Sequence, residues 1–512
     1  MASPLEDDIF DSLKKTAQAS EQAKQDQELV SRLHAQYVNQ QQREASILAD
    51  NNTLPVTISE VRVLHASTTR RTFLERICKP LIKADGDEPI TLLEARQEIQ
   101  RVATSLEKLG IYKSPISAYV DVADPTKPST SPTDLTVYFS AQERGKYTVK
   151  TGTEAGHSEG SAYADVQLRN LFGGAESLNA HASLGTRTKS AYSAFFDSPV
   201  LSNPDLRFEA GGLVSSTLKP WASHEERLSG GSTKLRWLSP GGHRHEIGYS
   251  GVWRQITGVA KNAAPSVRLD AGDTFKSAIA HTWIAERRDY PLLPSRGYLL
   301  KTVSELAGFG PLGGDVGFAK VELESAAAVP VPVPGFGLDS GVSLTAGFRA
   351  GMLYPLAIGS ASRPQPSRIN DRFQLGGPTD VRGFHLSGLG PHEAGDALGG
   401  DVYAAGGASL LLPFPRTGKD TPLRLQLFAN GGRLLGLRGR KGEEMDSAAV
   451  ARGMRDTVHR LGDGMPSWAA GVGIVYAHPL ARFEVNFSLP VAVRRGEEAR
   501  KGVSFGVGIS FL

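Results

Sequence analysis

The chain has 512 residues, 40% of them hydrophobic, and a formal net charge of +3. This length exceeds what one compact core usually fills, so at least two domains are expected. The near balance of charge argues against a nucleic-acid partner, and the single cysteine, Cys78, excludes an intramolecular disulfide framework. The sequence contains no run of eighteen or more apolar residues, which excludes transmembrane helices. A transmembrane β-barrel passes that test, because its strands alternate lipid-facing and lumen-facing side chains.

Residues 1–53 are predicted to be a polar segment that is partly helical or disordered. The first ten residues are acidic and match neither a secretory signal nor an Arg-rich mitochondrial presequence. We therefore expect a protein that reaches its membrane without a cleaved presequence. The Gln-, Ala- and Lys-rich stretch that follows favours a solvated tail with a transient helix over a dedicated docking helix.

Residues 54–144 are predicted to form one compact α+β domain. An imperfectly alternating strand over 56–64 precedes a helix over 70–84. Thr91 and Glu94 then form a capping box before a second helix that ends at Gly110. Two strands follow, at 116–122 and 135–142, separated by a Pro- and Ser-rich turn. This β-α-α-β-β order resembles that of a POTRA domain.

Residues 145–512 are predicted to be strands joined by turns. Leu423, Leu425 and Leu427 alternate with polar neighbours, and Phe483 and Val485 do the same near the end of the chain. Such alternation places a polar row inward and an apolar row against lipid. The turn signals divide the segment into about sixteen strands, an even number as in most membrane barrels. The predicted fold is therefore mainly β: a transmembrane antiparallel β-barrel of about 16 strands, preceded by one α+β POTRA domain.

Strand parity assigns the connections to the two faces of the membrane. The Pro- and Gly-rich turns fall on the side of residues 54–144, where short turns are expected. A long loop, residues 360–400, starts from the opposite face and is expected to fold into the lumen. An insertion at 443–461 lies on that same opposite face, and the spacing of Met445, Ala449, Met454 and Val458 predicts an amphipathic helix. This helix either packs on the barrel rim or docks a partner, and the sequence leaves both possibilities open.

The long loop contains a distinctive tetrad: Val381, Arg382, Gly383 and Phe384. The tetrad resembles the signature of the superfamily of outer-membrane β-barrel insertases and translocators, whose best-known bacterial member is BamA. The resemblance implies that Arg382 is held inside the barrel by a wall motif of the form Phe-x-Asp-x-Gly. The matching positions here are Phe428, Asn430 and Gly432, so an amide replaces the usual carboxylate. A buried Arg without a carboxylate is costly, and Glu484, inward by strand parity, is the predicted substitute.

The first and last strands are predicted to form a seam that opens. The final strand is rich in Gly and Ser, its partner after residue 145 is short and polar, and few packed side chains line either edge. An opened seam exposes strand edges that can template an incoming strand. We assign these residues to the lateral gate: Lys146, Thr148, Lys150, Ser504, Gly506, Gly508 and Phe511.

One POTRA domain, the absence of an export signal and about sixteen strands together resemble the family of central barrel subunits of the mitochondrial sorting and assembly machinery. The resemblance implies an insertase that folds β-barrel precursors into the mitochondrial outer membrane, with the POTRA domain in the intermembrane space. The implied partners are β-barrel precursors, peripheral subunits on the cytosolic face and membrane lipid. The alternatives are a passive polypeptide or solute channel, a bacterial-type assembly factor and a structural scaffold. Motifs for covalent chemistry, cofactors or metals are not found, so no enzyme activity is predicted.

Overall fold

The computed structural model describes residues 40–508, apart from gaps at 41, 44–45, 48, 83–89, 125, 127–130, 132, 157–158, 333–339, 359–362, 415–420, 438–445 and 480. Most of the predicted polar segment 1–53, the start of the 443–461 insertion and the gate residue Phe511 therefore lie outside the described residues. The chain divides into two compact units, one of 1–67 with 74–143 and one of 68–73 with 144–512. Within the described residues, every helix is too short or too polar to cross a membrane.

The smaller unit contains a four-stranded sheet in the order β2-β1-β4-β3. Its elements follow one another along the chain: β1 (Pro55–Leu64), α2 (Arg71–Cys78), β2 (Ile90–Thr91), α3 (Leu92–Lys108), β3 (Ser117–Val122) and β4 (Asp134–Ser140). β1 runs parallel to β4, and β3 pairs with β4 in the antiparallel sense. The helix α3 begins at the predicted capping box, because Thr91 accepts from the Glu94 backbone N–H and the Glu94 carboxylate accepts from that of Thr91.

The first helix of this unit is shorter than the predicted 70–84, since α2 ends at Cys78. Pro80 explains the difference: a proline disfavours helical backbone at the residue before it, here Lys79. The apolar faces of both helices are nonetheless buried, with Ile77 at 8% and Leu106 at 0% exposure. The unit therefore has a hydrophobic core of its own.

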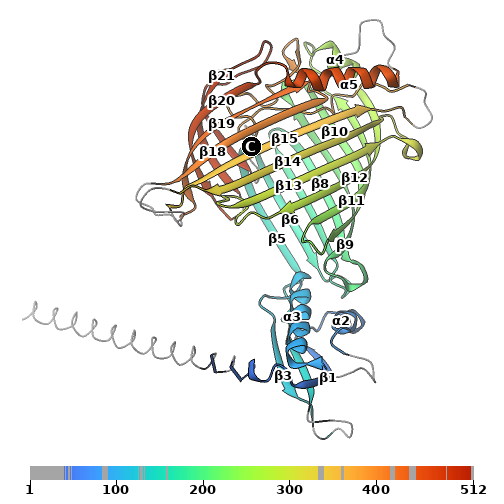
Figure 1. The fold of residues 1–512 in the computed structure, drawn as a ribbon. Helices are drawn as coiled ribbons and strands as arrows, with labels where there is room; N and C mark the ends of the chain where they lie inside the picture. Colours follow the sequence, from blue (N-terminus) through green and yellow to red (C-terminus); the bar gives the residue numbers. More distant parts are fainter. Residues whose placement is uncertain are drawn as a thin grey trace, which may run out of the picture. The chain divides into compact units, whose positions relative to one another are not determined.

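The larger unit is a sixteen-stranded antiparallel sheet that curves into a barrel (Figure 1). Each strand pairs with the next one in the sheet: β5 (Tyr147–Gly156), β6 (Glu159–Arg169), β7 (Ser177–Gly185), β8 (Thr188–Pro199), β9 (Leu206–Lys219), β10 (His224–Leu238), β11 (Arg244–Thr257), β12 (Gly272–Glu286), β13 (Gly297–Ala307), β14 (Phe318–Pro330), β15 (Ser343–Pro355), β18 (Val402–Pro413), β19 (Leu423–Leu435), β20 (Ser467–Ala477), β21 (Arg482–Ala492) and β22 (Gly502–Gly508). The predicted number of strands and the mainly β fold class are confirmed.

Burial follows the predicted alternation. On β21, Glu484 and Asn486 are fully buried, whereas Val485 and Phe487 are 45% and 41% exposed. The polar row faces the lumen, where it finds hydrogen-bond partners, and the apolar row faces outward.

The connections carry a few short elements. The 3-10 turns are η1 (Val200–Ser202), η2 (Pro220–Ala222) and η3 (Gly310–Leu312), and α4 (Pro265–Leu269) precedes β12. A small hairpin, β16 (His392–Glu393) with β17 (Asp396–Ala397), lies in the long loop between β15 and β18. The helix α5 (Ser447–Gly462) joins β19 to β20 and lies across the barrel rim (Figure 1). Both long insertions connect an odd to an even strand of the barrel, and they therefore leave the wall on the same face.

Candidate functional site: the lumen loop and the seam

The loop between β15 and β18, which we call the lumen loop, contacts the inner wall on strands that are far apart in the sheet. Val381, Phe384 and Leu389 of the loop belong to one buried apolar cluster with wall residues from β12 to β20. Side chains from widely separated strands can contact one segment only if that segment lies inside the barrel.

Arg382 is the most deeply held polar residue of the loop, at 1% exposure. Its Nε donates to Oε2 of Glu484 at 3.0 Å, and its Nη2 donates to Oε1 of the same carboxylate at 3.3 Å. Arg482 contributes a second guanidinium to this carboxylate, and the Asn486 amide donates to it at 2.7 Å. The Glu484 carboxylate therefore satisfies two buried cations, which is the arrangement that makes a buried charge tolerable.

The other wall positions of the family motif also meet Arg382. Its guanidinium carbon lies 4.9 Å from the centre of the Phe428 ring, within the range of cation–π contact. With its amide oxygen assigned toward Arg382, Asn430 accepts from the Arg382 backbone N–H at 3.0 Å and from Nη1 at 3.3 Å. At Gly432 an added Cβ would lie 2.8 Å from a Leu375 methyl carbon, so the missing side chain lets the loop approach the wall.

The tetrad needs glycine at its third position for two reasons. Gly383 has a φ of +86°, a region that favours glycine. A Cβ at this position would also lie 2.7 Å from Cβ of Ala469 on β20. The flanking Val381 and Phe384 are 0% and 3% exposed, so the whole tetrad is packed between the loop and the wall.

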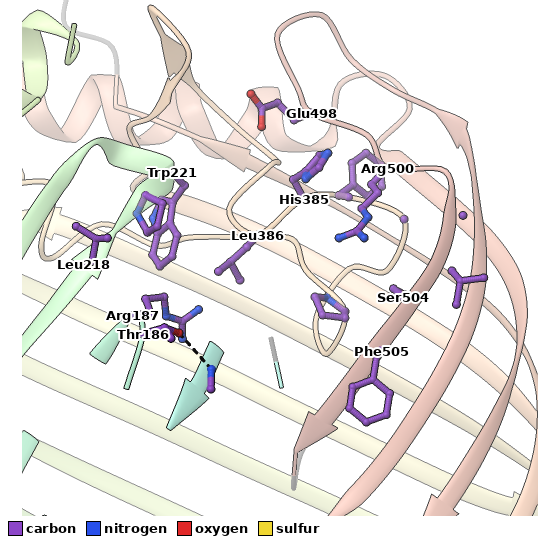
Figure 2. Close-up of a pocket in the computed structure, with 17 residues that line it drawn as sticks. Thr186, Arg187, Leu218, Trp221, His385, Leu386, Glu498, Arg500, Ser504 and Phe505 are labelled. Atoms are coloured by element: carbon purple, nitrogen blue, oxygen red, sulfur yellow. Dashed lines mark hydrogen bonds between the residues drawn. The ribbon is translucent and has the colours of Figure 1, made fainter. Parts of the chain in front are cut away.

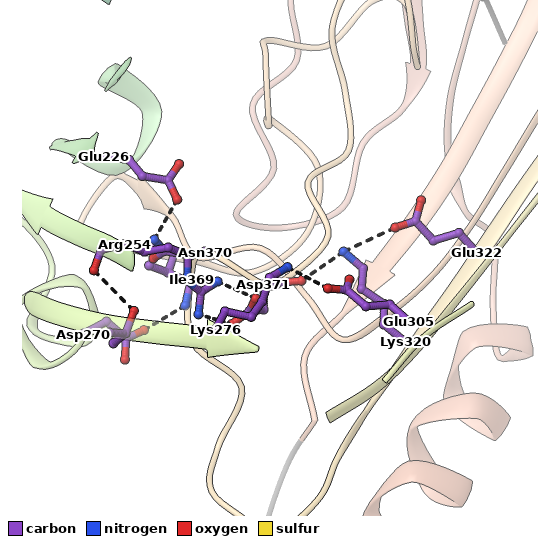
Figure 3. A network of polar contacts seen from close by, with 11 residues as sticks. Glu226, Arg254, Asp270, Lys276, Glu305, Lys320, Glu322, Ile369, Asn370 and Asp371 are labelled. Carbon is purple, nitrogen blue, oxygen red and sulfur yellow. Dashed lines mark hydrogen bonds and ion pairs between the residues drawn. The ribbon is translucent and has the colours of Figure 1, made fainter. Parts of the chain in front are cut away.

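A second anchor fixes the loop to the other side of the lumen (Figure 3). The Asp371 carboxylate accepts two hydrogen bonds from Arg254 of β11, at 2.6 and 3.1 Å, and both side chains are buried. Lys320 of β14 donates to the Asp371 carbonyl oxygen at 3.2 Å. The Asn370 amide donates to Glu226 at 2.7 Å. Sequence reasoning missed this anchor, because an inward Arg and a loop Asp form no local motif.

The lumen loop is also hydrogen-bonded to the segment that enters the last strand. The Arg500 N–H donates to the Gly383 carbonyl at 2.8 Å, and the His385 N–H donates to the Glu498 carbonyl at 3.1 Å. The Glu498 N–H in turn donates to the Gly388 carbonyl at 2.8 Å. Since β22 begins at Gly502, the loop that carries the tetrad is attached by backbone hydrogen bonds to the start of the last strand.

A cavity of about 1070 Å³ lies beside this attachment (Figure 2). Leu386 of the loop and Arg500, Ser504 and Phe505 at the last strand line one part of it, and Trp221 after β9 lines another. The cavity therefore lies between the loop, the last strand and the connections of the early strands, on the face from which the loop enters.

The residues predicted to form the lateral gate lie in or directly before the two end strands of the sheet, except Phe511, which lies outside the described residues. Thr148 and Lys150 belong to β5, which pairs with β6 from Tyr147–Leu168 to Gly156–Glu159, and Lys146 immediately precedes β5. Ser504, Gly506 and Gly508 belong to β22, which pairs with β21 over its seven described residues. Along the described part of the chain, no hydrogen-bonded ladder joins β5 to β22.

The predicted helical insertion is α5, which starts at Ser447. Its N-cap Asp446 accepts from the Ser447 backbone N–H at 2.7 Å. Val450, Met454 and Thr457 are its buried residues, whereas Val458 is 46% exposed. The helix therefore has one face packed on the protein and one open face.

Comparison with known proteins shows the family to which the chain belongs. The model of the Omp85 superfamily domain matches residues 170–511. The chain belongs to the Omp85 superfamily. It is 35% identical to a SAM50-like protein of Schizosaccharomyces pombe, over 91% of this chain and 93% of that protein. It is 32% identical to the human sorting and assembly machinery component 50 homolog, over 82% of this chain and 84% of the relative. Among solved structures, BamA from Haemophilus ducreyi lacking POTRA domains 1–3 has a similar fold, with a TM-score of 0.67 at 12% identity, covering 88% and 84% of the two chains.

Proposed function

We propose that this protein is an insertase that folds β-barrel precursors into the mitochondrial outer membrane through a lateral gate between β5 and β22. Its relatives, named as components of the sorting and assembly machinery, support the role, and the match covers most of each chain. The barrel architecture supports the placement in an outer membrane. The mechanism invokes no covalent step and no cofactor.

The ends of the sheet support a gate at this position. In the described part of the chain no hydrogen-bonded ladder joins β5 to β22, whereas every other pair of neighbouring strands in the sheet is hydrogen-bonded. Ladder pairing is what holds neighbouring strands together, so a seam without a described ladder is the easiest place in the wall to open. The open edges offer unpaired N–H and C=O groups to a substrate strand, which binds by adding to the sheet.

The contacts of the lumen loop support a role for this loop in controlling the gate. The tetrad is fixed to β19 and β21 through Arg382, and its Gly383 is fixed to the segment before β22. The loop therefore holds the start of the last strand from inside the barrel. We propose that this attachment keeps β22 aligned while a substrate strand pairs along its free edge.

The remaining parts fit this role. We propose that residues 54–144 are a POTRA domain in the intermembrane space, with 1–53 as a polar segment before it and 145–512 as the barrel. In that orientation α5 and the entrance of the lumen loop face the cytosol, where peripheral subunits of the machinery would bind. A passive channel is disfavoured, because the loop and the wall share a buried apolar cluster inside the lumen. A bacterial-type assembly factor fits less well with relatives from fungi and animals.

The decisive experiment traps a substrate at the seam. Cysteines are placed at Lys150 on β5 and at Ser504 on β22, and a matching cysteine is placed in the final strand of a substrate barrel. We expect disulfides between substrate and both positions during assembly, lost once the substrate has been released. A cysteine at Ala346, on the outer face of β15, is the matched control. Equal trapping at Ala346 and at the seam would overturn the lateral gate.

A further inference from the structure

A groove of about 500 Å³ lies on the outer surface of the barrel, beneath the end of α5. Gly406 of β18 and Gly431 of β19 form its floor, Phe348 and Trp468 flank it, and Leu461 and Pro466 cover its upper end. Phe348 pairs directly with Gly406, and Gly431 pairs with Trp468, so each pair shares one face of the sheet. Phe348 is 44% exposed, and the shared face is therefore the outer one.

Small residues give this groove its depth. A Cβ at Gly431 would lie 2.6 Å from Cβ of Trp468, so any larger residue would displace the flanking aromatic side chain. At Gly406 an added Cβ would make ordinary van der Waals contacts, at 3.5 Å from the Gly347 carbonyl oxygen and 3.7 Å from a ring carbon of Phe348. An apolar channel with aromatic walls on the lipid-facing side of a barrel accommodates a hydrocarbon chain.

A buried cation lies at the upper end of the groove. Arg433 lines the groove on the same face of β19 as Gly431 and is only 6% exposed. Its Nη1 donates to the carbonyls of Leu461, at 3.0 Å, and of Asp463, which holds the end of α5 over the groove. Its Nε is buried and has no hydrogen-bond partner in the described part of the chain. A buried guanidinium N–H without an acceptor is costly, and an anion at this place would satisfy it.

The charges around Arg433 favour such an anion. Arg460 and Arg494 lie close enough to repel its charge, and Asp463 and Glu497 offset this in part. The cluster has three cations against two carboxylates and keeps a positive excess. Arg433 lies near the end of β19, and phosphate headgroups are the anions that a membrane presents at its surface.

We propose that this groove binds one anionic phospholipid, with an acyl chain between Phe348 and Trp468 and its phosphate beside Arg433 and Arg460. The site rests on the proposed membrane placement and is independent of the gate. By filling the groove, the lipid fixes the end of α5 against the outer wall. The sequence left open whether this helix packs on the rim or docks a partner, and the proposed lipid favours packing on the rim with lipid between.

Lipid binding can be measured on the full-length protein without any substrate. Delipidated protein in detergent is titrated with phosphatidylglycerol or phosphatidylcholine, and bound lipid is counted by native mass spectrometry. We expect one tight site that prefers phosphatidylglycerol. Gly406→Leu should fill the groove and weaken this site about tenfold or more, whereas Ala408→Leu, on the same outer face of β18 but outside the groove, should not. Arg460→Gln should lower the affinity for phosphatidylglycerol about fivefold and that for phosphatidylcholine, whose phosphate is offset by its own cation, by less.

Three results would overturn the proposal. If Gly406→Leu and Ala408→Leu bind phosphatidylglycerol equally well, the groove is not the site. If the wild type shows no preference between the two lipids, the cation cluster does not select a headgroup. A third result, unchanged lipid binding by Gly406→Leu together with loss of a protein subunit, would assign the groove to a protein partner and also refute the lipid site. Normal heat-modifiable migration of each variant checks that its barrel has formed.

Discussion

The backbone N–H of Arg500 donates to the carbonyl of Gly383 at 2.8 Å, and this bond links the loop tetrad to the entrance of the last strand. Gly383 follows Arg382, whose guanidinium is held by Glu484 on β21, and β21 is the neighbour of β22 in the sheet. The last strand is therefore attached twice, once through its ladder with β21 and once through the loop. Loosening the loop removes one of these attachments without breaking the wall.

The first prediction concerns the anchor of the tetrad. Arg382→Ala leaves Glu484 paired with Arg482. It also empties the space over the Phe428 ring and removes the guanidinium that fixes the loop to the wall. Removing one partner of a buried ion pair costs about 3 to 5 kcal/mol. We expect the variant to be inserted as a barrel, to become protease-sensitive in the loop and to assemble substrate barrels at least about tenfold more slowly in isolated mitochondria. Normal assembly by Arg382→Ala would remove the functional role of the loop.

The second prediction concerns the ion pair between Arg382 and Glu484. Glu484→Gln keeps the shape of the side chain and removes its charge, so two buried guanidinium groups lose their common partner. A double-mutant cycle with Arg382→Ala, read from the free energy of unfolding, should give a coupling of about 1 kcal/mol or more. The control is a second cycle that combines Arg382→Ala with Asp197→Asn. Asp197 lies in a separate ion cluster with Arg207 and Arg236, so the two changes in the free energy of unfolding should be additive. Additivity for Glu484 as well would transfer the role of partner to Asn430.

The barrel was predictable because strand alternation is a local signal with a period of two residues. Turn residues then divided the chain into strands, and strand parity alone indicated that Glu484 faces inward. The helix predicted over 70–84 is too long, because Pro80 disfavours helical backbone at Lys79 and α2 ends at Cys78.

The features that the sequence does not predict depend on groups that meet only once the sheet has curved into a barrel. Asp371 and Arg254 are 117 residues apart in the sequence, with the four strands from β12 to β15 between them, and no spacing rule connects them. The same holds for the bond between Arg500 and Gly383, which joins two irregular segments through backbone atoms. Arg433 resembles any strand arginine in the sequence, and its role at the end of α5 follows from the path of a long insertion.

The third prediction tests the second anchor. Asp371→Asn replaces the charged partner of Arg254 by an amide and leaves a buried cation unpaired. We expect increased protease cleavage in the half of the lumen loop that precedes the tetrad, with the Arg382 anchor intact. Combined with Arg382→Ala, the loop should be released entirely and assembly should fall below that of either single variant. If the double variant equals Arg382→Ala, the two anchors do not act separately on the loop.

The fourth prediction uses the only cysteine of the sequence. Cys78 in α2 is 4% exposed, and burial raises the pKa of its thiol to about 11 from its ordinary value of 9.0. Since burial favours the neutral thiol, its contribution to stability is complete below pH 9.0 and is lost as the pH rises toward 11. We expect native protein at pH 8 to react with a disulfide reagent far more slowly than urea-unfolded protein. Rapid native labelling that disappears in Cys78→Ser would contradict the burial of this thiol.

The last prediction concerns a disulfide that locks the seam. Because Cys78 is buried and should react slowly in the native protein, it should not interfere with the introduced cysteines. Neighbouring strands are antiparallel throughout the sixteen-stranded sheet, so β5 and β22 run in opposite directions. Cysteines at Thr148 near the start of β5 and Gly508 near the end of β22 therefore form one pair to test, and cysteines at Gly152 and Ser504 form a second. We expect oxidation of either cysteine pair to block the assembly of substrate barrels and reduction to restore it, because a closed seam offers no free edge. The matched control is a cysteine pair at Ala327 and Ala346, which are already directly opposite within the β14–β15 ladder, and locking it should change nothing. If the locked seam assembles substrates at the rate of this control, the lateral gate is wrong and the barrel acts as a channel or a scaffold.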